Sequence, residues 1–120
     1  HVQHVPAGEG IGYGSTYVTP EPMTIATIPV GYADGYPRSL SNRGTVLIHG
    51  TRCPVVGRIC MDQFMVAVPD TITVKPGDKV VLLGSQGHES ISALEIAALA
   101  STIPYEIFCG FSERVPRQYV

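Results

Sequence analysis

The sequence predicts a mainly β protein: a closed, Greek-key-like β-barrel with one short α-helix near residues 92–102. Short apolar runs rich in Val, Ile and Thr recur along the 120 residues, and turns that contain Gly, Pro or both separate them. A single stretch has the apolar spacing and the capping residues of a helix. A barrel is favoured over a sandwich because full closure leaves no strand edge exposed to other chains.

The predicted strands follow a polar first segment. Residues 1–10 contain Gly and Pro and are interpreted as a linker leading into the domain, which is expected to occupy residues 11–120. Pro76 and Gly77 fit the two central positions of a type II turn. Strands are expected at residues 23–30, 45–49, 54–56, 64–68, 79–83, 105–111 and 115–120.

The one predicted helix has a clear beginning. Ser92 and Glu95 match a capping box, in which each side chain bonds the backbone amide of the other residue. Ile91 and Ile96 stand at the positions of a hydrophobic staple, which fixes the angle at which the chain enters the helix. Pro104 cannot continue a helix, so we expect the helix to end shortly before it.

Charge and cysteine content exclude several classes of function. The net charge is −2 with no long run of either sign, so a nucleic-acid or anionic-membrane surface is not expected. Only 15% of the residues are charged, against about a quarter in typical domains, which indicates that part of the surface is normally covered. Three cysteines without metal-ligand spacing indicate reduced thiols, a cytoplasmic location and no metal site.

The ends of the chain add two expectations. No apolar run has membrane-spanning length, and no signal peptide is recognisable. The first residue is His1 and not Met, so we expect the chain to begin inside a longer polypeptide or after a cleaved tag.

Four segments combine side chains capable of chemistry with glycines or prolines that shape the backbone. Tyr13 lies between two glycines, so its ring can project without neighbouring side chains in the way. Taken singly, each segment admits a plain structural interpretation: a Tyr in a β protein usually packs half-buried, and an Arg–Asp pair in a turn is usually a weak surface ion pair. The segments are Gly12-Tyr13-Gly14-Ser15-Thr16-Tyr17, Ile28-Pro29-Val30-Gly31-Tyr32-Ala33-Asp34-Gly35, Val56-Gly57-Arg58-Ile59-Cys60-Met61-Asp62-Gln63 and Pro104-Tyr105-Glu106.

Together with Arg114-Val115-Pro116-Arg117, these motifs resemble, in this order, the carboxy-terminal domain of bacterial alanine racemase. The resemblance covers essentially the whole chain, and residues 57–63 are its most specific part. It implies a pyridoxal-phosphate enzyme of two domains that interconverts L- and D-alanine and supplies D-alanine for cell-wall peptidoglycan. The amino-terminal domain, absent from these 120 residues, would be a (β/α)₈ barrel carrying the lysine that binds the cofactor. The functional unit would be a homodimer, with each active site between one subunit's barrel and the partner's carboxy-terminal domain.

The resemblance also assigns roles to single residues. Tyr13 would be the second catalytic base, delivered across the interface to the partner's active site. The backbone N–H of Met61 would bind the substrate carboxylate, and Tyr105 would hydrogen-bond the cofactor phosphate within its own subunit. The corridor through which the substrate enters would be lined by Tyr32, Arg38, Arg58 and Ile103.

Two other functions stay open. The chain could be a β-barrel that binds a partner or ligand without catalysis, because barrel folds host many functions. It could also belong to a racemase of serine or of broader specificity, because much of substrate selection is expected in the missing domain. The 120 residues alone are expected to be inactive, because neither Lys75 nor Lys79 lies in a segment suited to hold a cofactor.

Overall fold

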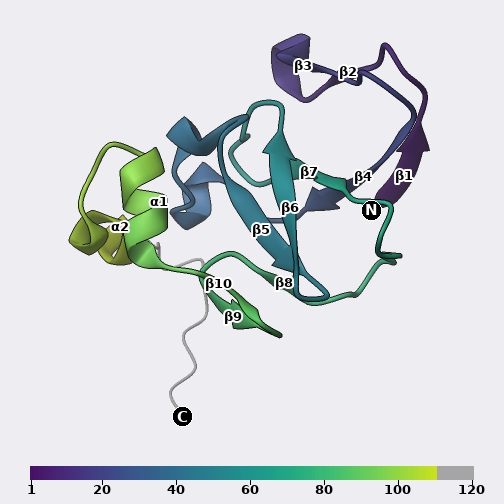
Figure 1. Cartoon of the computed structure of the whole chain (residues 1–120). Helices are drawn as coiled ribbons and strands as arrows, with labels where there is room; N and C mark the ends of the chain where they lie inside the picture. Colours follow the sequence, from purple (N-terminus) through teal and green to yellow (C-terminus); the bar gives the residue numbers. More distant parts are fainter. Residues whose placement is uncertain (111–120) are drawn as a thin grey trace.

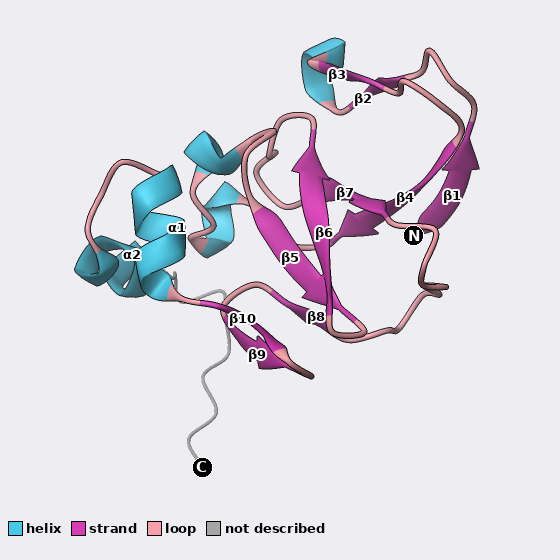
Figure 2. Cartoon of the chain, in the orientation of Figure 1, coloured by secondary structure: helices cyan, strands magenta, loops and turns pink. Residues whose placement is uncertain are grey.

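The computed structural model describes residues 1–110, apart from the side chains of Tyr105, Phe108 and Cys109. An antiparallel six-stranded sheet dominates it, and the two α-helices lie together at one end of the molecule, beside the sheet (Figures 1 and 2). The sheet order is β1 (Val2–Val5), β4 (Met23–Ile28), β7 (Phe64–Val68), β6 (Thr51–Val56), β5 (Thr45–Ile48) and β8 (Val80–Val81). The mainly β class and the strands expected near residues 23–30, 45–49, 54–56 and 64–68 are confirmed.

The expected closed barrel is wrong. The sheet curls around its core, but β1 and β8 stand at opposite ends of the strand order, and no pairing between them occurs within residues 1–110. At β8 only two residues pair with β5, Val80 with Ile48 and Val81 with Leu47, so this edge is too short to continue the ladder. The result is a half-barrel whose edge strands are short, which is another way to limit edge-to-edge pairing.

Residues 2–5, part of the segment expected to be a linker, form the other edge of the sheet. Val2 pairs with Ala26, and Val5 pairs with Met23. The polar character of this segment concealed its apolar ends: Val5 is buried and Val2 is half-buried, whereas Gln3 and His4 are exposed. The segment therefore belongs to the fold.

Side chains alternate between two cores on the two faces of the sheet, as the period of two in a strand requires. On β7, Phe64, Val66 and Val68 enter the main core, whereas Ala67 enters a smaller second core. A hairpin of β2 (Gly10–Ile11) and β3 (Tyr17–Val18) contributes Ile11 and Tyr17 to this second core. The second core therefore fixes the hairpin against the sheet, and the hairpin carries the turn that contains Tyr13 (Figure 1).

The helix expected near residues 92–102 is confirmed as α1 (Ala93–Leu99). The Ser92 hydroxyl accepts a hydrogen bond from the Glu95 amide at 3.0 Å, as the capping motif predicts. The Glu95 carboxylate, however, binds Arg52. The turn at Pro76 and Gly77 is also confirmed, with φ 94° at Gly77.

The strand expected at residues 105–111 is wrong. Residues Pro104–Gly110 form a second helix, α2, which packs beside α1. Pro at the first helical position and Glu106 in the first turn both favour a helix, and Ile107 is buried in the main core. The strand expected at residues 115–120 and the motif at residues 114–117 lie outside the described residues. Within residues 1–110, neither helix has the length and apolar character needed to cross a bilayer.

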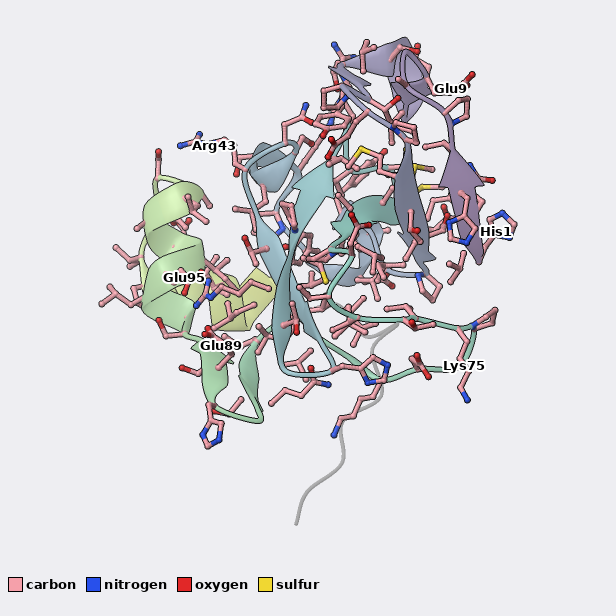
Figure 3. The ribbon with its side chains drawn as sticks, turned by 45° about the vertical axis from the view of Figure 1, so that its right-hand side comes forward. His1, Glu9, Arg43, Lys75, Glu89 and Glu95 are labelled. Carbon is pink, nitrogen blue, oxygen red and sulfur yellow. The ribbon has the colours of Figure 1, made fainter. Side chains whose placement is uncertain are left out.

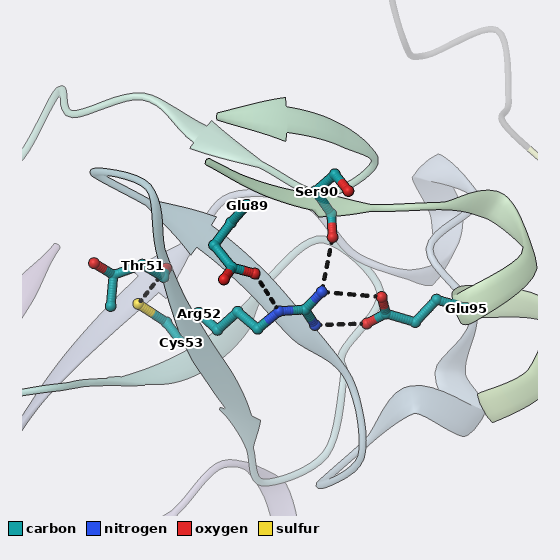
Figure 4. A network of polar contacts seen from close by, with 6 residues as sticks. All are labelled: Thr51, Arg52, Cys53, Glu89, Ser90 and Glu95. Carbon is teal, nitrogen blue, oxygen red and sulfur yellow. Dashed lines mark hydrogen bonds and ion pairs between the residues drawn. The ribbon is translucent and has the colours of Figure 1, made fainter. Parts of the chain in front are cut away.

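Arg52 on β6 joins the sheet to the elements before α1 (Figure 4). Its Nε donates to Glu89 at 2.8 Å, and its two terminal nitrogens donate to both carboxylate oxygens of Glu95 at 2.8 and 3.1 Å. One of these nitrogens also donates to the Ser90 carbonyl at 2.7 Å. Glu89 and Ser90 belong to β10 (Glu89–Ile91), which forms a hairpin with β9 (Gly84–Gln86). This network fixes the helical end of the molecule to the sheet.

Candidate functional site

A cavity of about 220 Å³ opens where the β2–β3 hairpin meets the loop between β6 and β7. Of the seven residues expected in the site, five line it: Tyr13, Tyr32, Arg38, Arg58 and Met61. Ile59 and Cys60 complete its lining. Segments far apart in the sequence therefore converge on one surface.

Tyr13 stands on a 3-10 turn (Tyr13–Ser15) between β2 and β3. Its flanking residues Gly12 and Gly14 have φ 76° and 75°, values that favour glycine, so the sequence Gly-Tyr-Gly is what permits this turn. Tyr13 is 73% exposed. The Arg58 guanidinium carbon lies 6.0 Å from the centroid of its ring, which places a cation beside the phenol that projects from the surface.

The loop of residues 57–63 has a defined shape. The Cys60 amide donates to the Gln63 carbonyl at 2.9 Å, and the buried Ile59 donates its amide to the Ser41 hydroxyl at 2.9 Å. Met61 is 55% exposed at the tip. None of the hydrogen bonds within residues 1–110 uses the Met61 amide, which therefore remains available to a ligand.

The segment after β4 fastens onto the same loop. The amides of Tyr32 and Ala33 donate to the carbonyls of Cys60 and Met61 at 3.0 and 2.9 Å. A Cβ atom on Gly31 would collide with those carbonyls, so only glycine allows the two backbones to approach this closely. The 3-10 turn Tyr32–Asp34 is further held by the Asp34 carboxylate, which accepts from the Gly31 amide at 3.0 Å.

Two arginine–tyrosine pairs give the cavity its electrostatic character. The Arg38 guanidinium carbon lies 5.9 Å from the centroid of the Tyr32 ring, and Arg58 stands in the same relation to Tyr13. Cations beside phenol rings and an unused amide N–H suit a small anionic ligand such as a carboxylate. Among the described residues, no group of three or more His, Cys, Asp or Glu could hold a metal ion.

Two expected site residues lie elsewhere. Ile103 is 57% exposed just before α2, and Tyr105 lies in the first turn of α2. Ile103 does not line the cavity. α2 packs against α1 at the other end of the molecule from the β2–β3 hairpin (Figure 1). The structure therefore places the expected residues in two separate groups.

The chain brings no lysine to the cavity. Lys75 and Lys79 are the two lysines of the sequence. Lys75 lines a different cavity, of about 240 Å³, together with His1 and Val80. In Figure 3, Lys75 and His1 lie on one side of the molecule and Arg43 lies on the other. Any reaction that needs an amine in the first cavity must take it from outside these residues.

The sequence analysis missed two residues that shape the cavity without lining it. The Asn42 carboxamide contacts both the turn that follows Tyr13 and the start of the Met61 loop. Ser41 accepts the amide of Ile59. Their signal in the sequence was only a Ser-Asn pair before Arg and Gly, which is typical of any turn.

Comparison with known proteins gives a consistent result. Residues 1–119 match the family model described as "Alanine racemase, C-terminal domain". An alanine racemase of Symbiobacterium thermophilum is 62% identical over 118 residues, which are 98% of this chain and 31% of that protein. The crystal structure of alanine racemase from E. faecalis superposes with a TM-score of 0.94 at 48% identity, covering 100% of this chain and 32% of that one.

A second solved structure is informative about a cofactor. The alanine racemase from Bartonella henselae, described with covalently bound pyridoxal phosphate, has a TM-score of 0.88 at 40% identity, covering 99% of this chain and 32% of that one. The chain thus spans about a third of the length of the curated relatives it matches.

Proposed function

The chain belongs to the alanine racemase family, as its carboxy-terminal domain, and from this premise we propose that it completes the active site of a pyridoxal-phosphate-dependent enzyme that interconverts L- and D-alanine. The observation that carries the proposal is the cavity lined by the exposed Tyr13, by Arg38 and Arg58, and by Met61, whose backbone amide is free within residues 1–110. In the cell the enzyme would be cytoplasmic and would supply D-alanine for cell-wall peptidoglycan.

Tyr13 is proposed to move the proton on one face of the substrate Cα. Racemisation removes a proton from one face of this carbon and returns a proton to the other, so it needs an acid–base group on each side. The Tyr13 hydroxyl stands on a projecting turn with its ring 73% exposed, which suits a group that acts on a ligand held by another surface. A lysine outside these residues would serve the opposite face.

Met61 and the two arginines are proposed to handle the substrate carboxylate. The Met61 N–H, which is free within residues 1–110, donates to the carboxylate and so orients Cα toward Tyr13. Arg38 and Arg58, with Tyr32, form a corridor whose positive charge favours the approach of an amino acid through its carboxylate. Ile103 would line the same corridor in the assembled enzyme.

The residues on this chain fit part of a pyridoxal-phosphate site. The phenol and the carboxylate-binding amide suit the substrate side, and because neither lysine of the sequence lines the cavity, the covalent bond to the cofactor is proposed to come from a lysine of a preceding domain. When bound, the cofactor supplies the electron-withdrawing ring that makes the Cα proton removable. Tyr105 is proposed to hydrogen-bond its phosphate.

A head-to-tail homodimer is proposed because of how the site residues divide. The Tyr13 cavity lies at the hairpin end of the molecule, and Tyr105 lies in the first turn of α2 at the other end (Figure 1). In a head-to-tail dimer, Tyr105 serves the active site of its own subunit, and Tyr13 serves that of the partner. Each site then contains both residues, although each chain keeps them apart.

Hybrid dimers test this arrangement. One full-length subunit carries Tyr13→Phe, and the other carries a substitution of the cofactor lysine, so that neither homodimer is active. In a hybrid, the intact lysine faces the intact Tyr13 of the other subunit, and random mixing of equal amounts restores about a quarter of the wild-type activity. No activity in the mixture, with hybrid formation verified by native mass spectrometry, contradicts delivery of Tyr13 across the interface.

A further inference from the structure

Asn42 occupies a special backbone position between the two halves of the cavity. It follows the 3-10 turn Arg38–Leu40 and has φ 59°, a left-handed conformation that Asn tolerates better than most residues. The backbone conformation at residue 42 therefore favours Asn on its own, apart from the contacts of the side chain.

The side chain of Asn42 hydrogen-bonds two segments at once. Its Oδ1 accepts the Gly57 amide at 2.6 Å, and its Nδ2 donates to the Thr16 hydroxyl at 3.0 Å. The backbone adds a third bond, from the Asn42 amide to the Gly57 carbonyl at 3.2 Å. Thr16 directly follows the turn Tyr13–Ser15, and Gly57 directly precedes Arg58 in the loop that carries Met61.

We propose that Asn42 is a positioning residue that sets the Tyr13 phenol relative to the Met61 amide through its bridge between Thr16 and Gly57. The proposal rests on the proposed function, in which Tyr13 acts at Cα and Met61 binds the carboxylate of the same small substrate. The carboxylate is bonded directly to Cα. If the phenol moves relative to the amide, its alignment with the proton on Cα therefore changes.

Few contacts among the described residues orient the tip of the hairpin. β2 and β3 pair through only two positions, Gly10 with Val18 and Ile11 with Tyr17. The second core holds the pair next to the turn, Ile11 and Tyr17. Beyond that pair, Gly12 lies close to the backbone of Gly57 and Arg58, and the exposed Tyr13 and Thr16 contact the side chains of Arg58 and Asn42.

Loss of the Asn42 bridge should change the alignment of the hairpin tip more than the stability of the fold. Asn42 and Thr16 are exposed, so water can replace the lost hydrogen bond and the fold should tolerate the change. The equilibrium constant between the aligned and the displaced tip should nevertheless fall by about 3–10-fold, the factor that the net value of one hydrogen bond corresponds to. This loss falls on the face of Cα that Tyr13 serves, and less on the opposite face.

The test compares α-proton exchange with solvent deuterium, in the full-length enzyme, starting from L-alanine and from D-alanine separately. Thr16→Val removes the acceptor of the bridge, Thr16→Ser keeps it, and Asn42→Gly removes both side-chain bonds while allowing the left-handed backbone. Thr24→Val is the matched control, because it deletes an exposed Thr hydroxyl bonded to His4 at 2.8 Å, away from the cavity.

We expect Thr16→Val and Asn42→Gly to lower the ratio of L to D exchange by about 3–10-fold, with Thr16→Ser and Thr24→Val close to wild type. An unchanged ratio in both Thr16→Val and Asn42→Gly overturns the proposal, even where their stability falls. Tyr13→Phe, measured alongside, separates the two hypotheses: if it also leaves the ratio unchanged, the proposed function of Tyr13 fails, and if it alone changes the ratio, only the role of Asn42 fails.

Discussion

Gly57 is a position at which the structure predicts a large effect of adding one methyl group. It has φ 83°, and a Cβ atom there would lie 2.7 Å from the Ile11 carbonyl oxygen and 3.1 Å from its carbon. Ile11 belongs to the hairpin that carries Tyr13, so Gly57→Ala would push the hairpin from the loop that carries Met61. Gly77 is a matched control, because it has φ 94° and no atom within 4 Å of its added Cβ.

The difference between the two substitutions isolates the steric contact. Both place an alanine in the left-handed region, at a cost of about 1–2 kcal/mol, and both reduce the entropy of the unfolded chain to a similar extent. Only Gly57→Ala adds overpacking against backbone atoms that cannot rotate away, which costs about 1–3 kcal/mol more.

Urea unfolding of the 120-residue chain, followed by circular dichroism, measures this difference. With a slope of about 1–3 kcal/mol per molar urea, the midpoint of Gly57→Ala should lie about 1 M below that of Gly77→Ala, with the slope unchanged. Free energies of unfolding that agree to within about 0.5 kcal/mol, the usual scatter between independent sites, would show that the hairpin does not pack on Gly57 as described.

Three further predictions concern groups outside the cavity. Arg52→Gln should lower the free energy of unfolding by only about 1 kcal/mol, and by less at high salt, because the side chains of Arg52 and Glu89 are 41% and 45% exposed and water screens their charges. A loss several times larger, measured by urea unfolding, would contradict this. The hydrogen bond from Arg52 lowers the pKa of Glu95 below its ordinary 4.5. The ionised carboxylate therefore stabilises the fold above pH 4.5, and this stabilisation is lost as pH falls through the lowered pKa. Urea midpoints measured down to acid pH should therefore fall less on acidification in Arg52→Gln than in the wild type. Burial raises the pKa of the Cys53 thiol to about 11, so iodoacetamide at neutral pH should spare Cys53 in the native chain and modify it in urea, and peptide mapping that finds rapid native modification would contradict its burial.

The parts of the fold that sequence could predict are those set by local patterns. Residues 64–68 alternate between two cores as apolar residues in a strand do, and the bounds Phe64–Val68 are confirmed. The helix at Ala93–Leu99 followed from its cap at Ser92. Residues 105–111 were predicted as a strand because they are rich in aromatic and β-branched residues, but the burial of Ile107 in the core overrides that preference.

Long-range geometry accounts for what sequence could not predict. Whether the sheet closes depends on whether its edge strands β1 and β8 pair with each other, and no local pattern determines this. In the cavity, Tyr13, Tyr32 and Met61 were found because their motifs are distinctive. Asn42 was missed because its partners lie 15 and 26 residues away, so its role exists only in the folded chain.

The central claim is that the Tyr13 hydroxyl transfers the proton on one face of the substrate. Its most direct test is deuterium incorporation at Cα by full-length Tyr13→Phe, measured from L-alanine and D-alanine separately, with Tyr17→Phe as control because that hydroxyl bonds Met23 at the base of the same hairpin. We predict that exchange from L-alanine falls by about 10²–10⁴-fold, that exchange from D-alanine persists in part, and that Tyr17→Phe exchanges both at near wild-type rates. Equal retention of exchange from both enantiomers in Tyr13→Phe would show that Tyr13 is an ordinary surface residue and would contradict the account.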